Sequence, residues 1–199
     1  MHGKLYLASL SPRRRELIKL LGVPVELLEP AGIDEGVFIN RFTGPGGELP
    51  IALAEAKARL VLPKISDGFL VCADTDVIHN GEALGKPVDS EDAARMLHRL
   101  SGEWHEVVTG VSVAKAPEGD LITDASITRV KFASLTGDEI ERYVASGEPM
   151  DKAGAYGIQG LAAPFIERIE GCYFNVVGLP INLLYGLLKR MGFEFEADE

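Results

Sequence analysis

The stretch SLSPRRRELIKLLG at residues 9–22 places three consecutive arginines, beginning at Arg13, in the first turn of a predicted helix. Ser11 is a favoured N-cap residue, Pro12 suits the first helical position, and Gly22 suits the position just past the end. Cations at a helix N-terminus are disfavoured by roughly 0.3–1 kcal/mol each, whereas backbone N–H groups and arginine side chains can hold a phosphate there. This conflict favours an anion site; the alternative is an exposed basic turn whose arginines are solvated.

Two carboxylates follow an apolar run in FLVCADTDV, residues 69–77. The run at 69–73 is typical of a strand buried on both faces, so Asp74 is expected at its carboxyl end, where sites in open α/β sheets usually lie. Asp74 could act there as a general base or a metal ligand, or it could cap a turn. Asp76 faces the same side if the segment is extended. The pair suggests a divalent cation, although a solvated surface aspartate fits Asp76 equally well.

Two lysines lie where a cation could serve a site. Lys57 is four residues from both Leu53 and Val61 in an alanine-rich predicted helix, so the three side chains lie on one face. Lys57 therefore either extends its ammonium to water or delivers it into a cleft. Lys86 follows a predicted Asn-Gly hairpin turn, in a loop where functional and idle cations are both common. Neither lysine is decisive alone.

Glycine recurs at every third position of the loop at 148–160, at Gly154, Gly157 and Gly160. This density suggests tight turns or a close approach of the backbone to a ligand. Gln159 offers both a donor and an acceptor, which suits the edge of a nucleobase. An ordinary turn-rich loop is the alternative.

Composition excludes several classes of function. The 199 residues carry a net charge of −10, which argues against binding a nucleic acid polymer or an anionic membrane. No apolar run reaches the ~18 residues of a membrane span. Cys72 lies in an apolar run and is expected to be a buried hydrophobe, so we predict a cytoplasmic protein. His105 lacks the sequence context of a serine or cysteine nucleophile, such as GxSxG, and is interpreted as structural; no zinc-ligand spacing is present.

The elements that must position these residues follow from the hydrophobic pattern. Predicted strands span residues 4–8, 25–28, 69–73, 104–114, 121–132 and 165–169, and predicted helices span 12–21, 50–62, 90–100, 137–146 and 180–191. A long loop at 29–49 carries Asp34 and Glu35. Crossovers combined with a long hairpin indicate an α/β fold with a mixed sheet. Without a flexible linker, residues 1–199 are expected to form a single domain with its core at about 4–190 and a frayed acidic tail at 192–199.

These features suit one class of ligand. Several cations on loops and at a helix start, an aspartate at a strand end, further carboxylates at 34–35 and a glycine-rich loop together favour a magnesium-bound polyphosphate. The residues alone thus predict metal-assisted phosphate-ester chemistry and do not name a substrate.

The ordered motifs LASLSPRRRELIKLLG, ADTDV, GKP, LSGEWHEVVTG, GEPMDKAGAYGIQG and NVVGLPI resemble the Maf family of nucleoside triphosphate pyrophosphatases, once described as septum-formation inhibitors. The resemblance spans residues 4–190. It implies an ITPase-like α/β fold, in which a mixed sheet flanked by helices forms two lobes around a central cleft, commonly in a homodimer. It also implies a hydrolase that cleaves between the α- and β-phosphates with a divalent cation, Mg²⁺, Mn²⁺ or Co²⁺. The products are a nucleoside monophosphate and pyrophosphate.

The resemblance also assigns roles. Asp74 looks like the proton acceptor that activates water and, with Glu35, a ligand of the cation. Positions associated with substrate binding and selection are Arg13, Thr75, Gln159, Ser9, Arg14, Glu35, Lys57 and Lys86. The loop DKAGAYGIQG resembles the branch that acts on dTTP and UTP. The alternative is a nucleotide-binding regulator of cell division with little turnover.

Asp76 departs from the family pattern, which usually has Val or Ile at this position. Pointing away from the core, the carboxylate would be harmless. Pointing inward without a partner, it would cost several kcal/mol or shift its pKa strongly. Facing the metal, it could alter the preference for a cation. The sequence leaves these alternatives open.

Overall fold

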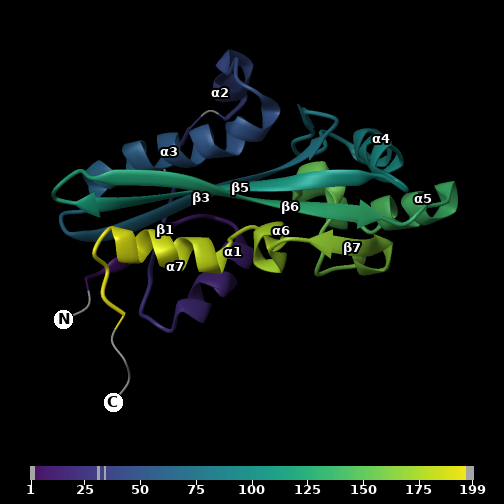
Figure 1. Ribbon diagram of the computed structural model, residues 1–199. Helices are drawn as coiled ribbons and strands as arrows, with labels where there is room; N and C mark the ends of the chain where they lie inside the picture. The colour runs from purple at the N-terminus through teal and green to yellow at the C-terminus, as the bar shows by residue number, and fades with distance from the viewer. Residues whose placement is uncertain (1–2, 31, 34, 196–199) are drawn as a thin grey trace.

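A seven-stranded mixed sheet runs through the molecule (Figure 1). The computed structural model describes residues 3–30, 32–33 and 35–195, with the side chains of Glu35 and Asn40 outside the description. The strands are β1 (Leu5–Ala8), β2 (Glu26–Leu28), β3 (Gly68–His79), β4 (Glu82–Ala83), β5 (Trp104–Ala116), β6 (Leu121–Phe132) and β7 (Ile166–Glu170). Their order is β2-β1-β3-β5-β6-β7, with β4 paired to the end of β3. β1 is parallel to β2 and β3, and the other pairs are antiparallel. The mixed sheet expected from the sequence is confirmed.

Helices cover both faces of the sheet. They are α1 (Pro12–Ile18), α2 (Glu35–Arg41), α3 (Leu49–Val61), α4 (Ser90–Leu100), α5 (Gly137–Ala145), α6 (Tyr173–Val177) and α7 (Ile181–Arg190). Figure 1 shows α2 and α3 on one face and α1, α6 and α7 on the other, with α4 and α5 near one end. None of the helices in the described ranges is long and apolar enough to cross a membrane.

Helix α3 lies close to the sheet because its inner face carries small residues. Ala54 and Ala58 are fully buried. The first turn of α3 passes over Gly110 of β5, where a Cβ atom would lie 2.5 Å from the carbonyl oxygen of Pro50. Glycine is therefore required at this crossing. Because Gly110 pairs with Asp74 across β3 and β5, the crossing also brings α3 beside Asp74.

Strand β3 is longer than the sequence predicted, and Asp74 lies within it rather than after its end. The register explains this. β1 pairs with β3 only as far as Leu7 opposite Val71, after which the chain turns into α1. β4 pairs only at the far end, with Ile78 and His79. Along residues 72–77, β3 therefore has one neighbouring strand among the described residues, β5. The strand itself continues beyond Ala73, but one of its edges is open there. Polar side chains therefore replace the apolar run without ending the strand.

Two other predictions are wrong in part, and one helix was missed. The segment 29–49, expected to be a loop, contains α2, and the short helix α6 was missed. The frayed tail was expected from residue 192, but Phe193 is 4% exposed and packs edge-on against Phe69. The ring of Phe195 in turn contacts Phe193 and Tyr185, so the chain is packed as far as residue 195 through these two phenylalanines. Residues 196–199 of the expected tail lie outside the described residues.

Candidate functional site

A cavity of about 900 Å³ opens along the free edge of β3. Its walls come from the turn before α1, helix α3, the β3–β4 hairpin, the glycine-rich loop and the end of α6. All predicted site residues whose side chains are described line this cavity: Ser9, Arg13, Arg14, Lys57, Asp74, Thr75, Lys86 and Gln159. Residues 74 and 75 point to opposite faces of the strand, and both reach one cavity because the edge between those faces is open.

Asp74 and Lys57 form an ion pair inside the cavity. Lys57 Nζ lies 2.6 Å from Asp74 Oδ1, and the two side chains are only 11% and 16% exposed. Leu53 and Val61, on the same face of α3, are buried against the sheet. The Lys57 ammonium therefore points into the cavity and does not extend to bulk water, which was the other alternative considered.

Arg14 binds the backbone around Asp74. Its Nη1 donates to the carbonyl oxygen of Ala73 at 2.9 Å, and its Nη2 donates to Thr75 Oγ1 at 2.9 Å. Its Nε donates to the carbonyl oxygen of Gly178 at 2.7 Å. The guanidinium therefore holds the residues on both sides of Asp74 and joins them to the end of α6.

The other two arginines have different partners. Arg15 Nε donates to the carbonyl oxygen of Ser9 at 2.9 Å, which braces the turn before α1. Ser9 is 4% exposed, and its Oγ accepts the N–H of Ser11. Arg13 reaches across the cavity to Asp151, with Nη1 lying 3.3 Å from Oδ2. Although partial burial raises the pKa of Asp151, Lys152 and Arg13 together hold that pKa below its usual value. The run of three arginines thus contributes one ion pair across the cavity and two structural clamps.

A buried polar network extends behind Thr75. Thr75 Oγ1 lies 2.8 Å from Thr109 Oγ1, which donates to the carbonyl oxygen of Asn175 at 3.2 Å. Asn175 is fully buried and its Nδ2 donates to Thr128 Oγ1 at 2.9 Å. The sequence reasoning missed Thr109 and Asn175. Their signal was a polar side chain within an otherwise apolar segment.

Asp76 points inward and is hydrogen-bonded. It is 7% exposed, and its Oδ1 accepts the backbone N–H groups of Val77 at 2.7 Å and Gly85 at 2.9 Å. Burial raises the pKa of Asp76 to about 6, against the effect of the two N–H bonds, and the charge of Asp74 raises it further. Of the alternatives considered from the sequence, the structure shows Asp76 pointing inward. Its carboxylate is not left unpaired, because two backbone N–H groups donate to it.

The glycine-rich loop approaches β3 closely. The N–H of Gly154 donates to the carbonyl oxygen of Gly85 at 2.8 Å, and a Cβ atom at Gly154 would lie 2.7 Å from Val77 Cγ2. With φ of +66°, Gly154 also occupies the left-handed region that favours glycine. Gln159, in the same loop, is exposed and lines the cavity. The close approach that the glycines suggested is therefore made, at Gly154, to strand β3 and not to a ligand.

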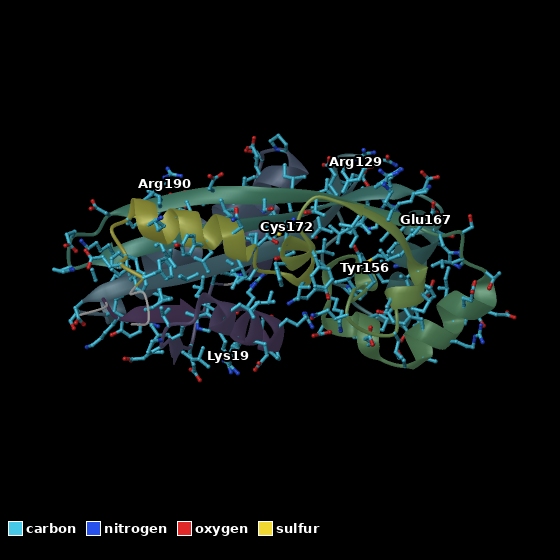
Figure 2. The ribbon with its side chains drawn as sticks, turned by 60° about the horizontal axis from the view of Figure 1, so that its bottom comes forward. Lys19, Arg129, Tyr156, Glu167, Cys172 and Arg190 are labelled. Atoms are coloured by element: carbon cyan, nitrogen blue, oxygen red, sulfur yellow. The ribbon has the colours of Figure 1, made fainter. Side chains whose placement is uncertain are left out.

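His105 and Cys72 are buried groups. His105 Nε2 lies 2.8 Å from Tyr156 Oη. Burial, helped by the nearby His79, lowers the pKa of His105 to about 3. Figure 2 shows Tyr156, the partner of His105, within the body of the molecule, in contrast to Glu167 at its periphery. Burial raises the pKa of Cys72 to about 12, and both cysteines are free. The expected burial of Cys72 is confirmed, and His105 is buried as well, while its structural role stays a prediction.

The donor set fits a cation that arrives with a phosphate ligand. Within the described ranges, no three His, Cys, Asp or Glu side chains converge as a metal site. Mg²⁺ is commonly bound by one or two carboxylates together with phosphate oxygens of the substrate. Asp74 supplies a carboxylate whose Oδ2 has no hydrogen-bond partner among the described residues. The second predicted ligand, Glu35, begins α2, and its side chain lies outside the described part of the chain.

Comparison with known proteins gives a consistent result. The family model described as "Maf-like protein" matches residues 4–191. A protein of Moorella thermoacetica is 50% identical over 190 residues, covering 96% of each chain. A protein of Syntrophomonas wolfei is 47% identical over 94% of this chain and 96% of its own. One of Carboxydothermus hydrogenoformans is 46% identical over 96% of this chain and 100% of its own. All three relatives are named dTTP/UTP pyrophosphatase.

Proposed function

The chain belongs to the Maf family, and we propose on that premise that it hydrolyses dTTP and UTP to the nucleoside monophosphate and pyrophosphate. One observation of the structure carries the proposal. A carboxylate ion-paired to Lys57 at 2.6 Å lies in a cavity that Arg13 also lines. This arrangement supplies a proton acceptor beside cations that suit a polyphosphate.

Asp74 is the general base in this proposal. Its Oδ2 accepts a proton from a water molecule while the water oxygen attacks the α-phosphorus. The bond from the α-phosphorus to the oxygen bridging the α- and β-phosphates breaks, and pyrophosphate leaves with the bond's electrons. Lys57 fixes Oδ1, and Arg14 fixes the backbone on both sides of Asp74, so the base is held in one position. General base catalysis of this kind contributes about 10²–10⁴-fold.

The phosphates are bound by cations on two sides of the cavity. Arg13 leaves its ion pair with Asp151 and binds a phosphate group instead. A planar guanidinium can bind two oxygens of one phosphate in a bidentate manner. Lys86 is exposed on the turn after β4 and supplies a point charge from the other side. Ser9 and Arg14 support the turn that carries Arg13.

Base selection is assigned to Gln159 and Thr75. The amide of Gln159 can donate to and accept from the imide edge of uracil or thymine. Thr75, held by Arg14 and Thr109, also lines the cavity and limits its shape. The names of the relatives support a pyrimidine substrate.

A divalent cation, Mg²⁺, Mn²⁺ or Co²⁺, is proposed to accompany the triphosphate, with Asp74 and Glu35 as protein ligands. When bound, such an ion neutralises charge on the phosphate oxygens. The cytoplasmic location, the homodimer and the single domain over 1–199 stay predictions.

The test measures pyrophosphate release from canonical and base-modified triphosphates, with each of the three metals, for the wild type and Asp74→Asn. We expect the wild type to release pyrophosphate preferentially from dTTP and UTP, and we expect the rate to fall by about 10²–10⁴-fold in Asp74→Asn because the general base is removed. The second candidate, a regulator that binds nucleotide with little turnover, follows from the same cavity. It is favoured instead if dTTP or UTP binds tightly and persists unhydrolysed with every metal.

A further inference from the structure

Asp76 is a buried carboxylate that the proposed reaction does not use. Its side chain lines the same cavity as Asp74, yet its residue is only 7% exposed. Burying a carboxylate is costly unless hydrogen bonds compensate. Here one oxygen, Oδ1, accepts two backbone N–H groups, from Val77 in its own strand and from Gly85 beyond β4.

The bond to Gly85 extends the β3–β4 hairpin. Ile78 pairs with Ala83, and the N–H of Leu84 donates to the carbonyl oxygen of Val77 at 2.9 Å. Gly85 is the next residue along, opposite Asp76, and its N–H goes to the Asp76 side chain at 2.9 Å. The carboxylate therefore adds one cross-strand hydrogen bond beyond the last bridge of the ladder. It holds the turn that leads directly to Lys86.

Gly85 also joins this turn to the glycine-rich loop. Its carbonyl oxygen accepts the N–H of Gly154 at 2.8 Å. Gly154 packs against Val77 without room for a side chain. Through Gly85, Asp76 is thus connected to both segments that carry cavity-lining polar residues on this side, with Lys86 on one and Gln159 on the other.

We propose that Asp76 is a positioning residue whose carboxylate holds Lys86 and, through Gly85 and Gly154, the loop bearing Gln159 at the cavity wall. This inference rests on the proposed function, in which those two side chains contact the nucleotide. It assigns to Asp76 a role in binding the triphosphate and selecting the base, separate from proton transfer at Asp74.

The experiment compares Asp76→Val, which removes the acceptor and suits a strand, with Asp76→Asn, which keeps an acceptor oxygen. Asp124→Val is the matched control because Asp124 Oδ1 also accepts the N–H of its following residue, Ala125, at 2.8 Å, but on the exposed part of β6. Steady-state kinetics with dTTP, UTP and CTP are measured for each protein. Hydrogen exchange of the Gly85 and Gly154 amides is followed by NMR.

For Asp76→Val we expect faster exchange at Gly85 and Gly154. We also expect KM for dTTP and UTP to rise about tenfold, the effect of losing a hydrogen bond to a charged group. The preference over CTP should narrow, and kcat should change much less than KM. Asp76→Asn should restore KM and exchange to near the wild-type values, and Asp124→Val should match the wild type throughout.

Three outcomes would overturn the proposal: unchanged exchange at Gly85 in Asp76→Val, a loss confined to kcat, or an Asn variant as impaired as the Val variant. Failure of the proposed function gives a different result, since the wild type itself would then release no pyrophosphate. In that case the dissociation constant for dTTP replaces KM, and its rise in Asp76→Val together with faster Gly85 exchange still supports the positioning role. An unchanged dissociation constant overturns it.

Discussion

Lys57 Nζ lies 2.6 Å from Asp74 Oδ1, in a pair whose side chains are 11% and 16% exposed. The two residues come from different elements, the middle of α3 and the open-edged part of β3. The close crossing of α3 over Gly110, the residue paired with Asp74, sets their separation. The ion pair is therefore a product of helix-on-sheet packing as much as of charge.

Removing one partner of this pair should affect both stability and catalysis. In Lys57→Met, the Asp74 carboxylate stays in a partly buried position without its ammonium. We expect a loss of about 1–3 kcal/mol in the free energy of unfolding, below the 3–5 kcal/mol of fully buried pairs because water still reaches the cavity. Urea denaturation measures this loss, and kcat should fall with it.

A double-mutant cycle separates the pair from its surroundings. Asp74→Asn combined with Lys57→Met should cost less than the sum of the single changes, since neither charge is then left alone. Strict additivity would mean that the two groups do not interact in solution. Lys64→Met, on an exposed residue just after α3, is the control and should leave the unfolding free energy unchanged.

The ion pair between Arg13 and Asp151 should compete with substrate. Its side chains are 33% and 63% exposed, so its contribution to stability is at most about 1 kcal/mol. Asp151→Asn frees Arg13 and removes a negative charge from the rim, so KM for dTTP should fall a few-fold with little change in the melting temperature. A rise in KM would show that Asp151 supports the loop more than it occupies Arg13. Asp67→Asn, on an exposed aspartate paired to Lys4, is the matched control.

Gln159 is expected to act on the choice of base. Because it is exposed at the cavity and outside the packed core, Gln159→Ala should leave the fold intact and reduce kcat/KM for dTTP and UTP by about 10–100-fold, with a smaller loss for CTP. Competition experiments with mixed triphosphates measure the ratios directly. An equal loss for every base would indicate that Gln159 shapes the loop without contacting the base.

His105 should make the protein sensitive to acid. Its pKa in the folded state is lowered from 6.5 to about 3 by burial and by His79, so below about pH 6 the unfolded chain takes up a proton that the folded chain excludes. The stabilisation present above that pH is lost as the pH falls toward 3, at about 1.4 kcal/mol per pH unit. Comparing His105→Gln with the wild type by urea denaturation between pH 4 and pH 8 isolates this contribution. The curves should converge in acid, and parallel curves would contradict the assignment.

The local elements were predictable because their signals are local. The Ser11 cap accepts the N–H of Arg14, and the Asn80–Gly81 turn closes the β3–β4 hairpin with positive φ at both residues. The long β5–β6 hairpin also agrees with the sequence. By contrast, the end of the apolar run at Ala73 predicted the end of the strand, and this was wrong. β3 continues through Asp74 and Thr75 because its open edge faces a cavity, where polar residues are tolerated.

Capping residues and apolar periodicity locate most of the strands and helices, and the side-chain types identify the candidate catalytic and binding groups. The partners of those groups depend on the fold: Lys57 pairs with Asp74, Arg14 binds the backbone around Asp74, and Asp76 binds Gly85. These contacts depend on β1 ending early beside β3 and on α3 crossing at Gly110. Strand order and helix crossing arise from packing between segments far apart in the chain, and neither periodicity nor capping encodes that packing.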